Sequence, residues 1–426
     1  MTDEFTVTID KLGARGDGIG EHDGLPVYVP QALPGETVTV CLVEKKRGGL
    51  YAKLVSIEQS SPSRNGPACK HFGSCGGCRI QHMGADAYHQ WICERAGFAL
   101  KQHGFDDVNI LTPYFAPVGS RRRASFKAHK GGSGVVLGFN AKSSHQIIDL
   151  TECPVSRPEI TQLIPALKAL LHRILPTRSI ASIHCTVAAN GLDVLFDAHL
   201  ELTLDARELL AEFAVAHDIA SLQWRNDGFL DPVAIRREPV MDFGGVRVPL
   251  PPGSFIQASG ECEQTMVSHV ETACKGFGRV ADLFCGVGTF TFPLAQDHQV
   301  LAVEGAQEAI QSLEAGRNGS AARGIRLKQI VSKHRDLFRR PLTRVELTGF
   351  DAVVIDPPRA GAQAQMAELA KSSVQRIVSV SCNPNTFARD ARILADGGYT
   401  LSSVLPVDQF LWSAHLEVIG IFDRDL

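Results

Sequence analysis

The chain lacks an excess of charge of either sign and lacks any long run of apolar residues. Its 426 residues include 43 Lys and Arg against 46 Asp and Glu, which gives a formal net charge of -3. A nucleic-acid-binding surface must therefore be local, because the chain as a whole does not attract a polyanion. The sequence contains no apolar stretch long enough to span a membrane and no recognisable signal peptide, so we expect a cytoplasmic protein without a membrane partner.

Internal repeats and low-complexity tracts are also absent. The eleven cysteines are an odd number, which argues against a disulfide framework and for a reducing compartment. The length allows about three domains, and 44% hydrophobic content is enough for sizeable cores.

Four short apolar runs in the last third of the chain each end in residues suited to binding or catalysis. They are residues 278–284, followed by Cys285, Gly286 and Gly288; residues 300–303, followed by Glu304; residues 351–355, followed by Asp356; and residues 376–380, followed by Ser381 and Cys382. Each run is typical of a buried strand, and open α/β sheets bind ligands at the carboxyl ends of their strands. The pattern predicts a site that combines a thiol with carboxylates.

The glycine turn after residue 284 predicts a nucleoside-binding loop. Gly286 and Gly288 allow close backbone approach, and Glu304, 18 positions after Gly286, is placed to accept ribose hydroxyls. Thr291 occupies the position of the third glycine of a dinucleotide fingerprint, so an adenosine ligand without a pyrophosphate fits better. An ordinary tight turn is the alternative for the glycine pair alone.

Four motifs resemble those of the S-adenosylmethionine-dependent RNA 5-methyluridine methyltransferases. They are Asp282-Leu283-Phe284-Cys285-Gly286-x-Gly288-x-Phe290, Asp356-Pro357-Pro358-Arg359-Ala360-Gly361, Ser381-Cys382-Asn383-Pro384 and His415-Leu416-Glu417. With the N-terminal features below, the likeness covers nearly the whole chain and is greatest for the 23S ribosomal RNA branch. The chain departs from the family at Ser259 and Thr289, where the family often has asparagine.

The resemblance implies a class I, Rossmann-like α/β methyltransferase domain and a mechanism. Carbon 5 of uracil is a poor nucleophile, and a thiolate that adds to carbon 6 activates it. Cys382 is the expected nucleophile, and Glu417 the expected base that removes the carbon 5 proton. A buried structural cysteine and a solvated carboxylate are the alternatives for these two residues. The expected residues for S-adenosylmethionine are Gln257, Phe284, Gly286, Gly288, Thr289, Glu304, Asp336 and Asp356.

A separate group of cysteines has the spacing of a metal site. Cys69, Cys75 and Cys78 form Cys-x5-Cys-x2-Cys, and Cys153 follows after 74 residues. The spacing alone does not exclude a zinc site with four cysteine ligands. The resemblance implies a 4Fe-4S cluster held by these four thiolates.

The N-terminal region, residues 1–60, alternates polar and apolar positions between glycine turns, which predicts a small β-barrel. It is similar to the TRAM domain, an RNA-binding barrel related in shape to OB folds. Residues 61–250 are expected to form a central α+β iron-sulfur domain, and residues 251–426 the methyltransferase domain. The candidates for RNA contacts are Arg121, Arg122, Arg123, Phe126 and Lys127, which mix cations with an aromatic ring.

The function expected from the sequence is methylation of carbon 5 of a uridine in RNA, with 23S rRNA as the substrate and the protein as a monomer. The alternatives are an RNA or DNA cytosine-5 methyltransferase and a non-catalytic iron-sulfur RNA-binding scaffold. Ser381 before the nucleophile and the carboxylate of Glu417 count against the cytosine enzymes, which place the thiol in a Pro-Cys context or use a second cysteine.

Overall fold

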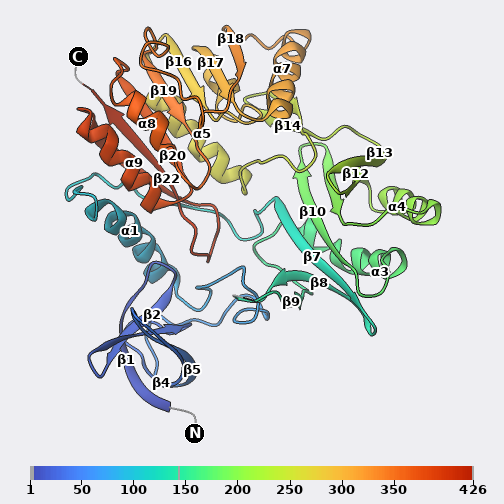
Figure 1. The fold of residues 1–426 in the computed structure, drawn as a ribbon, viewed down its shortest axis with the longest axis vertical. Coiled ribbons are helices and arrows are strands. Elements are labelled where there is room, and N and C mark those ends of the chain that lie inside the picture. Colours follow the sequence, from blue (N-terminus) through green and yellow to red (C-terminus); the bar gives the residue numbers. More distant parts are fainter. Residues whose placement is uncertain (1–3, 143, 425–426) are drawn as a thin grey trace.

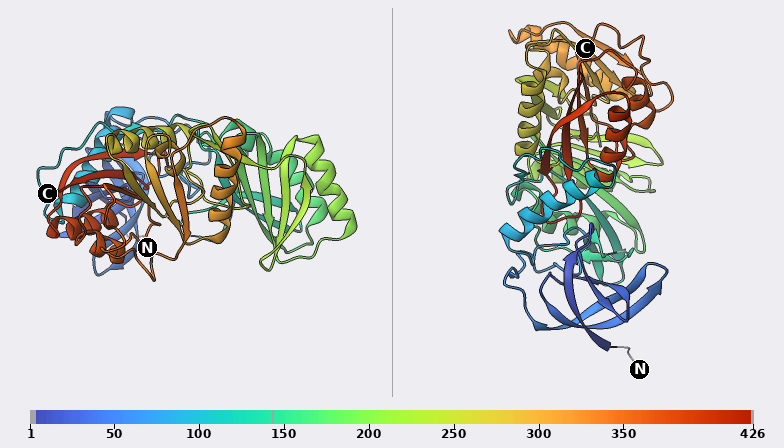
Figure 2. Two further views of the ribbon diagram at one scale, coloured as in Figure 1. Left: turned by 90° about the horizontal axis from the view of Figure 1, so that it is seen from above. Right: turned by 90° about the vertical axis from the view of Figure 1, so that its left-hand side faces the viewer.

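The computed structural model describes residues 4–142 and 144–424. It contains a closed β-barrel, a seven-stranded sheet and an eight-stranded sheet, which follow one another along the chain except for a few crossing segments (Figure 1). Figure 2 shows the barrel at one end of the long axis and the eight-stranded sheet at the other. No helix in the described ranges is long and apolar enough to cross a membrane.

The barrel confirms the expectation for residues 1–60. Its strand order is β1-β2-β3-β5-β4, with β1 (Glu4–Leu12), β2 (Asp17–His22), β3 (Leu25–Pro30), β4 (Thr37–Lys46) and β5 (Gly49–Gln59). Alternation along the strands turns Val7 and Ile9 of β1 and Val38 and Val40 of β4 into the core. Closure of the barrel leaves no unpaired edge.

The central sheet has the order β13-β12-β11-β10-β7-β8-β9. Its strands are β7 (Arg123–Gly131), β8 (Gly134–Asn140), β9 (Ile147–Asp149), β10 (Ile180–Ala188), β11 (Gly191–Asp197), β12 (Ile219–Asn226) and β13 (Phe229–Ile235). The helices are α2 (Pro158–Thr161), α3 (Ile164–Ile174) and α4 (Leu204–Ala216). Leu167 of α3 and Leu210 of α4 pack with Phe126 and Phe196 in one α+β core.

The C-terminal sheet has the order β18-β17-β16-β19-β20-β22-β21-β6. Its strands are β6 (Tyr114–Phe115), β16 (Arg279–Leu283), β17 (Gln299–Glu304), β18 (Ile330–His334), β19 (Ala352–Ile355), β20 (Arg376–Ser381), β21 (Thr400–Asp408) and β22 (Glu417–Asp423). The helices around it are α5 (Gly260–Cys274), α6 (Thr291–Leu294), α7 (Gln307–Ala322), α8 (Gln363–Leu369) and α9 (Pro384–Asp396). Val280 and Ala281, neighbours on β16, belong to cores on opposite faces, so the sheet is covered on both sides.

The strand order reverses at β16, which pairs in parallel with β17 on one side and with β19 on the other. Ligands of open α/β sheets bind at such a switch point, beyond the carboxyl ends of the strands. The four apolar runs recognised in the sequence are β16, β17, β19 and β20, so their C-terminal residues all lie at this edge.

Two segments of the expected central domain, residues 61–250, contact elements of the C-terminal sheet. Helix α1 (Ala85–Lys101) packs against α9, and β6 pairs with β21, so part of residues 61–250 belongs to the methyltransferase sheet. The hairpin β14 (Val240–Phe243) and β15 (Val246–Pro249) contributes Val246 and Val248 to the core beside α7. The expected boundary at residue 250 falls directly after this hairpin, and the boundaries at 60 and 250 stay predictions.

Candidate active site

Cys382 lies directly after β20, at the start of helix α9. The side chain of Asn383 caps this helix by accepting a hydrogen bond from the backbone N–H of Asn385 (3.1 Å), and Pro384 occupies the first turn. A strand and a capped helix therefore fix the thiol from both sides. Cys382 is half-buried and lines a groove together with Arg359.

The thiol of Cys382 is held in its neutral form. Burial, assisted by the nearby carboxyls of Glu417 and Asp356, raises its pKa to about 11, and the positive charge of Arg359 acts in the opposite direction. The thiolate needed for attack is therefore unfavourable in the free protein. Added positive charge in the site lowers this barrier.

The two carboxyls beside the thiol are also protonated more readily than usual. Burial, and then the negative charge of Asp356, raise the pKa of Glu417 to about 8, while the Gln409 amide lowers it. Burial raises the pKa of Asp356 to about 7, opposed by the hydrogen bond from Gln257. Glu417 is thus a buried carboxyl whose pKa lies close to neutral, as a general base requires.

Two glutamine side chains connect these carboxyls. The Gln257 amide donates to Asp356 Oδ2 (3.2 Å), and its Oε1 accepts from Gln409 Nε2 (2.9 Å). The same Gln409 nitrogen donates to Glu417 Oε1 (2.7 Å), and Gln409 Oε1 accepts from the backbone N–H of Ala258 (2.8 Å). Gln257, expected at the donor site, is therefore joined to the base through Gln409.

The sequence did not single out Gln409. It lies in the loop of residues 409–416 between β21 and β22, surrounded by residues without a recognised motif. Its role depends on the antiparallel pairing of β21 with β22, which sets Val407 opposite Glu417. Only this register brings the glutamine to the base.

Glu304 and the glycine turn form the other half of the site. Glu304 accepts hydrogen bonds from the backbone N–H groups of Gly286 (3.0 Å) and Ala306 (2.8 Å), and a carboxylate retains further lone pairs for two hydroxyls. Gly288 has a positive φ of 106°, and a Cβ there would lie 2.5 Å from the Phe292 ring. A Cβ at Gly286 would meet nothing within 4 Å, so open space borders this turn.

Aromatic rings border the same half of the site. Phe284 follows β16 with a φ of 59°, a strained value for a non-glycine residue. Its ring lies 5.2 Å from that of Phe338, which is 50% exposed and which the sequence did not indicate. Asp336 accepts from the backbone N–H groups of Phe338 (2.9 Å) and Arg339 (3.3 Å), so it orders the segment that carries this ring.

Thr291 has a structural role in place of the missing third glycine. Its hydroxyl donates to Asp282 Oδ2 (2.5 Å), and both side chains are buried. This contact ties α6 to the end of β16. Thr289 is half-buried in the same turn, where the structure gives no further account of its side chain.

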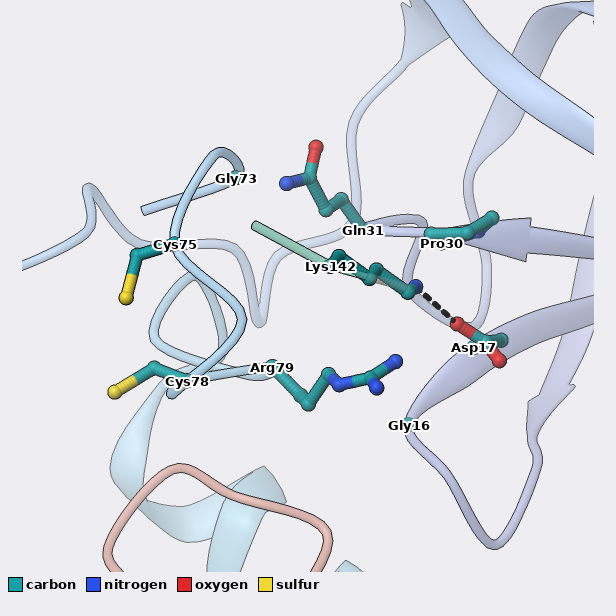
Figure 3. Close-up of a pocket in the computed structure, with 9 residues that line it drawn as sticks. All are labelled: Gly16, Asp17, Pro30, Gln31, Gly73, Cys75, Cys78, Arg79 and Lys142. Carbon is teal, nitrogen blue, oxygen red and sulfur yellow. Dashed lines mark hydrogen bonds and ion pairs between the residues drawn. The ribbon is translucent and has the colours of Figure 1, made fainter. Parts of the chain in front are cut away.

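The four cysteines of the predicted metal site come from two loops that lie together. The pKa of Cys78 is raised to about 12, first by burial and then by the neighbouring thiols of Cys153, Cys75 and Cys69. Figure 3 shows the Cys75 and Cys78 sulfur atoms on one side of their loop, away from the Lys142–Asp17 ion pair (3.0 Å). Within residues 4–142 and 144–424, no three His, Cys, Asp or Glu side chains are arranged to hold a single metal ion.

The cysteine loop also supports the active site. The backbone N–H groups of Arg79 and Ile80, next to Cys78, donate to the carbonyl of Trp412 at 2.7 and 3.2 Å. Trp412 belongs to loop 409–416 and has a φ of 61°. The segment that carries the cysteines therefore holds the loop that leads to Glu417.

Two of the residues expected to contact RNA, Phe126 and Arg122, are buried and have structural roles. Phe126 is fully buried in the central core, so it cannot stack on a base, and this prediction was wrong. It faces inward because it alternates along β7 with Lys127, which is exposed. Arg122 is buried and bonded to Glu263 (2.5 Å), so it joins β7 to α5 and does not face RNA.

The other two arginines of the run, Arg121 and Arg123, each lie over an aromatic ring. The Arg123 guanidinium donates to the carbonyl of Ile256 (3.2 Å) and lies over the exposed ring of Phe255 (5.3 Å). Arg121 lies over the ring of Phe410 (5.4 Å) in loop 409–416. Within the described ranges neither makes an ion pair, and their contacts with RNA, like that of Lys127, stay predictions.

A groove of about 1220 Å³ leads away from Cys382. Its walls are loop 409–416, helix α1 and the loop between β1 and β2 of the barrel. Figure 1 shows α1 between the barrel and α9. Cys382 thus lines a groove that also runs along the barrel.

Comparisons with known proteins agree with this arrangement. A family model described as tRNA (Uracil-5-)-methyltransferase matches residues 247–424, and a TRAM domain model matches residues 3–55. The 23S rRNA (uracil(1939)-C(5))-methyltransferase RlmD of Photorhabdus laumondii is 33% identical over 99% of this chain and 96% of its own length. The chain belongs to the RNA uracil-5 methyltransferase family.

Other relatives support the same membership. A Caulobacter vibrioides protein named as an RNA methyltransferase is 42% identical over 98% of this methyltransferase and 99% of its own chain. The solved structure of the Pyrococcus abyssi tRNA (uracil-54, C5)-methyltransferase with S-adenosyl-L-homocysteine has a TM-score of 0.75 at 23% identity. The alignment covers 98% and 99% of the two chains, so they share the whole fold. The TRAM prediction is confirmed.

Proposed function

We propose that the enzyme methylates carbon 5 of a uridine in 23S rRNA through a covalent bond between Cys382 and carbon 6. The observation that carries this proposal is that Cys382 lines an open groove, with Glu417 and Asp356 close enough to raise the pKa of its thiol. The choice of 23S rRNA is supported by the relative that is 33% identical and carries that substrate in its name.

The chain's own residues divide the reaction between them. Cys382 loses its proton to solvent, and its sulfur bonds to carbon 6 while the electrons of the carbon 5–carbon 6 double bond move onto carbon 5 and the carbonyl oxygen at carbon 4. Carbon 5 accepts the methyl group. Glu417 then takes the carbon 5 proton, and the electrons of that C–H bond restore the ring double bond and expel the thiolate of Cys382.

S-adenosylmethionine fits the half of the site around Glu304. The open space at Gly286 lets a ligand approach the backbone closely. The free lone pairs of Glu304 suit the hydroxyls of a ribose, and the exposed ring of Phe338 suits stacking on a base. The ligand supplies an electrophilic methyl group and, through its sulfonium, the positive charge that favours the Cys382 thiolate. Gln257 and Asp356 lie between this half and Cys382.

A 5-fluorouridine RNA tests the covalent step. Fluorine at carbon 5 cannot leave as a proton, so wild-type enzyme with S-adenosylmethionine should accumulate a linked species on denaturing gels. The Cys382→Ala variant should form none. Methylated product without any linked species would refute the mechanism, and 5-methyluridine mapping in 23S rRNA and tRNA from deletion cells tests the substrate.

We also propose that Cys69, Cys75, Cys78 and Cys153 hold a 4Fe-4S cluster. The neighbouring thiols lie close enough to contribute to the raised pKa of Cys69 and Cys78, and thiolates are the ligands that hold iron-sulfur clusters. Such a cluster ties two distant loops together. The Cys78→Ala variant should lose the brown absorbance and solubility, and anaerobic protein with full zinc and no iron would contradict the assignment.

A further inference from the structure

The groove beside Cys382 carries an excess of positive charge. Its lining includes five cations, Lys11, Arg15, Arg95, Lys101 and Arg359, against two acids, Asp10 and Glu94, an excess of three on a chain whose net charge is -3. None of the five cations makes an ion pair within the part of the chain that the structure describes. An excess of positive charge along a groove suits a polyanionic ligand.

Arg95 on α1 is the cation whose surroundings are most specific. Its Nη2 donates to the carbonyl of Ala414 (2.8 Å), and its guanidinium lies over the Trp91 ring (4.6 Å). Its Nη1 is buried, and no group of residues 4–142 or 144–424 accepts a hydrogen bond from it. The same holds for the buried Nε1 of Trp91, one turn earlier on the same helix.

Two unsatisfied donors one helical turn apart require acceptors, because buried polar groups in native proteins are nearly always hydrogen-bonded. Both residues line the groove, and because Nη1 and Nε1 are themselves shielded from solvent, an acceptor from the groove reaches them when the two side chains turn toward it. A phosphodiester supplies charged oxygens that match the fork of a guanidinium. The Trp91 ring beneath the Arg95 guanidinium fixes the orientation of the guanidinium plane.

Arg95 is also connected to the catalytic base. Ala414 lies three residues before Glu417, in the loop that contains Gln409. The same loop is held to α1 at a second point, since the backbone N–H of Trp412 donates to the Tyr88 hydroxyl (2.9 Å). A displacement of the Arg95 guanidinium therefore acts on the segment that presents Glu417.

We propose that Arg95 binds a backbone phosphate of the RNA next to the target uridine and thereby positions the loop that presents Glu417. This inference rests on the proposed function of the same site. Arg95 makes a contact to the substrate backbone through Nη1 and keeps the loop carbonyl through Nη2. It does not contact the reacting atoms, so it is a binding and positioning residue.

The salt dependence of RNA binding tests the phosphate contact. Full-length Arg95→Gln should bind a single-stranded uridine-containing RNA about fivefold to tenfold more weakly, and the slope of log K against log salt should fall by about 0.7, the loss of one phosphate contact. The matched control is Arg392→Gln, because Arg392 also lies over an aromatic ring, Phe105, but outside the groove. An unchanged slope in folded Arg95→Gln overturns the proposal.

Arg95→Lys tests the connection to the loop and covers the case in which the glutamine variant does not fold. Lysine keeps the charge but has a single nitrogen, so it cannot hold Ala414 and a phosphate together as a fork does. We expect a nearly unchanged salt slope, a wild-type rate of 5-fluorouridine adduct formation, and at least a fivefold slower release of 5-methyluridine product at saturating RNA, because Glu417 acts only after methyl transfer. A wild-type rate of product release in this variant refutes the connection.

Failure of the Arg95 proposal can be distinguished from failure of the proposed methylation reaction. Wild-type enzyme that binds RNA with the full salt slope but transfers no methyl group would remove the proposed reaction and leave the Arg95 contact intact. Methylation by wild type together with unchanged binding in Arg95→Gln would remove only the Arg95 contact.

Discussion

Two turns of the same sheet each carry a cysteine after a parallel strand, yet only one of them has the surroundings of a nucleophile. Cys285 follows β16 and is buried in the core, where burial raises its pKa well above the usual value. Cys382 follows β20, lines the groove and has Arg359, Glu417 and Asp356 as neighbours. Both thiols have carboxyls nearby, Asp282 and Glu304 for Cys285, so access to the groove and the positive charge of Arg359 are what set Cys382 apart.

Removal of the Cys382 sulfur should have the largest effect. Cys382→Ala should lower methyl transfer by roughly 10⁴-fold or more, because the covalent route is lost. RNA affinity and thermal stability should stay near wild type, since the side chain is small and half-buried. Radiolabelled methyl transfer to unmodified RNA measures the loss. Substantial residual turnover would mean that the thiol of another residue acts.

Replacement of the base should trap the enzyme on its substrate. Glu417→Gln should slow turnover by about 10²- to 10⁴-fold, while RNA without fluorine becomes linked to Cys382 after methyl transfer. The linked species is measured by denaturing electrophoresis with labelled RNA. The double variant with Cys382→Ala is the control and should show no linked species. Fast turnover in Glu417→Gln would assign the base to another group.

The pH profile should report the raised pKa of Glu417. Since only the ionised carboxylate accepts a proton, turnover should rise with pH up to about 8, where its pKa lies, and not level off near the ordinary value of 4.5. The Glu417 carboxyl binds its proton more tightly in the folded protein than in the unfolded one, so this proton stabilises the fold at low pH. The free energy of unfolding should therefore fall as the pH rises from 4.5 to about 8. Denaturant titrations should show this fall flattened in Glu417→Gln.

The Gln409 connection should have an intermediate effect. Gln409→Met keeps the side-chain length but removes the hydrogen bonds to Gln257, Glu417 and Ala258, and the free energy of unfolding should drop by about 1–3 kcal/mol. Because the amide lowers the pKa of Glu417, its loss should move the acid limb of the pH profile upward. If the acid limb of the Gln409→Met profile lies at the same pH as that of the wild type, the amide does not act on Glu417.

The other cysteine of the comparison should matter least for activity. Cys285→Ala should leave turnover within about threefold of wild type and lower stability by about 1 kcal/mol, a typical cost for truncation of a buried side chain. Methyl transfer assays and denaturant unfolding measure both. A loss of activity as large as that of Cys382→Ala would reverse the assignment of the two thiols.

The predictions made from the sequence succeeded where local pattern and chain order were sufficient. The barrel of residues 1–60 and strands β16, β17, β19 and β20 follow from alternation and apolar runs bounded by glycine or polar residues. The prediction for Phe126 failed because an aromatic ring between cations is typical of both an RNA surface and a β-strand. The alternation that buries it becomes evident only once β7 pairs with β10.

The sequence by itself determined the four strand ends, the thiol, the carboxylates and the family, because these depend on residue types at fixed short spacings. Only the tertiary structure decided which residues meet: Gln409 reaches Glu417 through the pairing of β21 with β22, and Arg95 reaches Ala414 because α1 packs beside loop 409–416. The physical reason is that hydrogen bonds act over about 3 Å in space, whereas Arg95 and Ala414 are 319 positions apart in the chain.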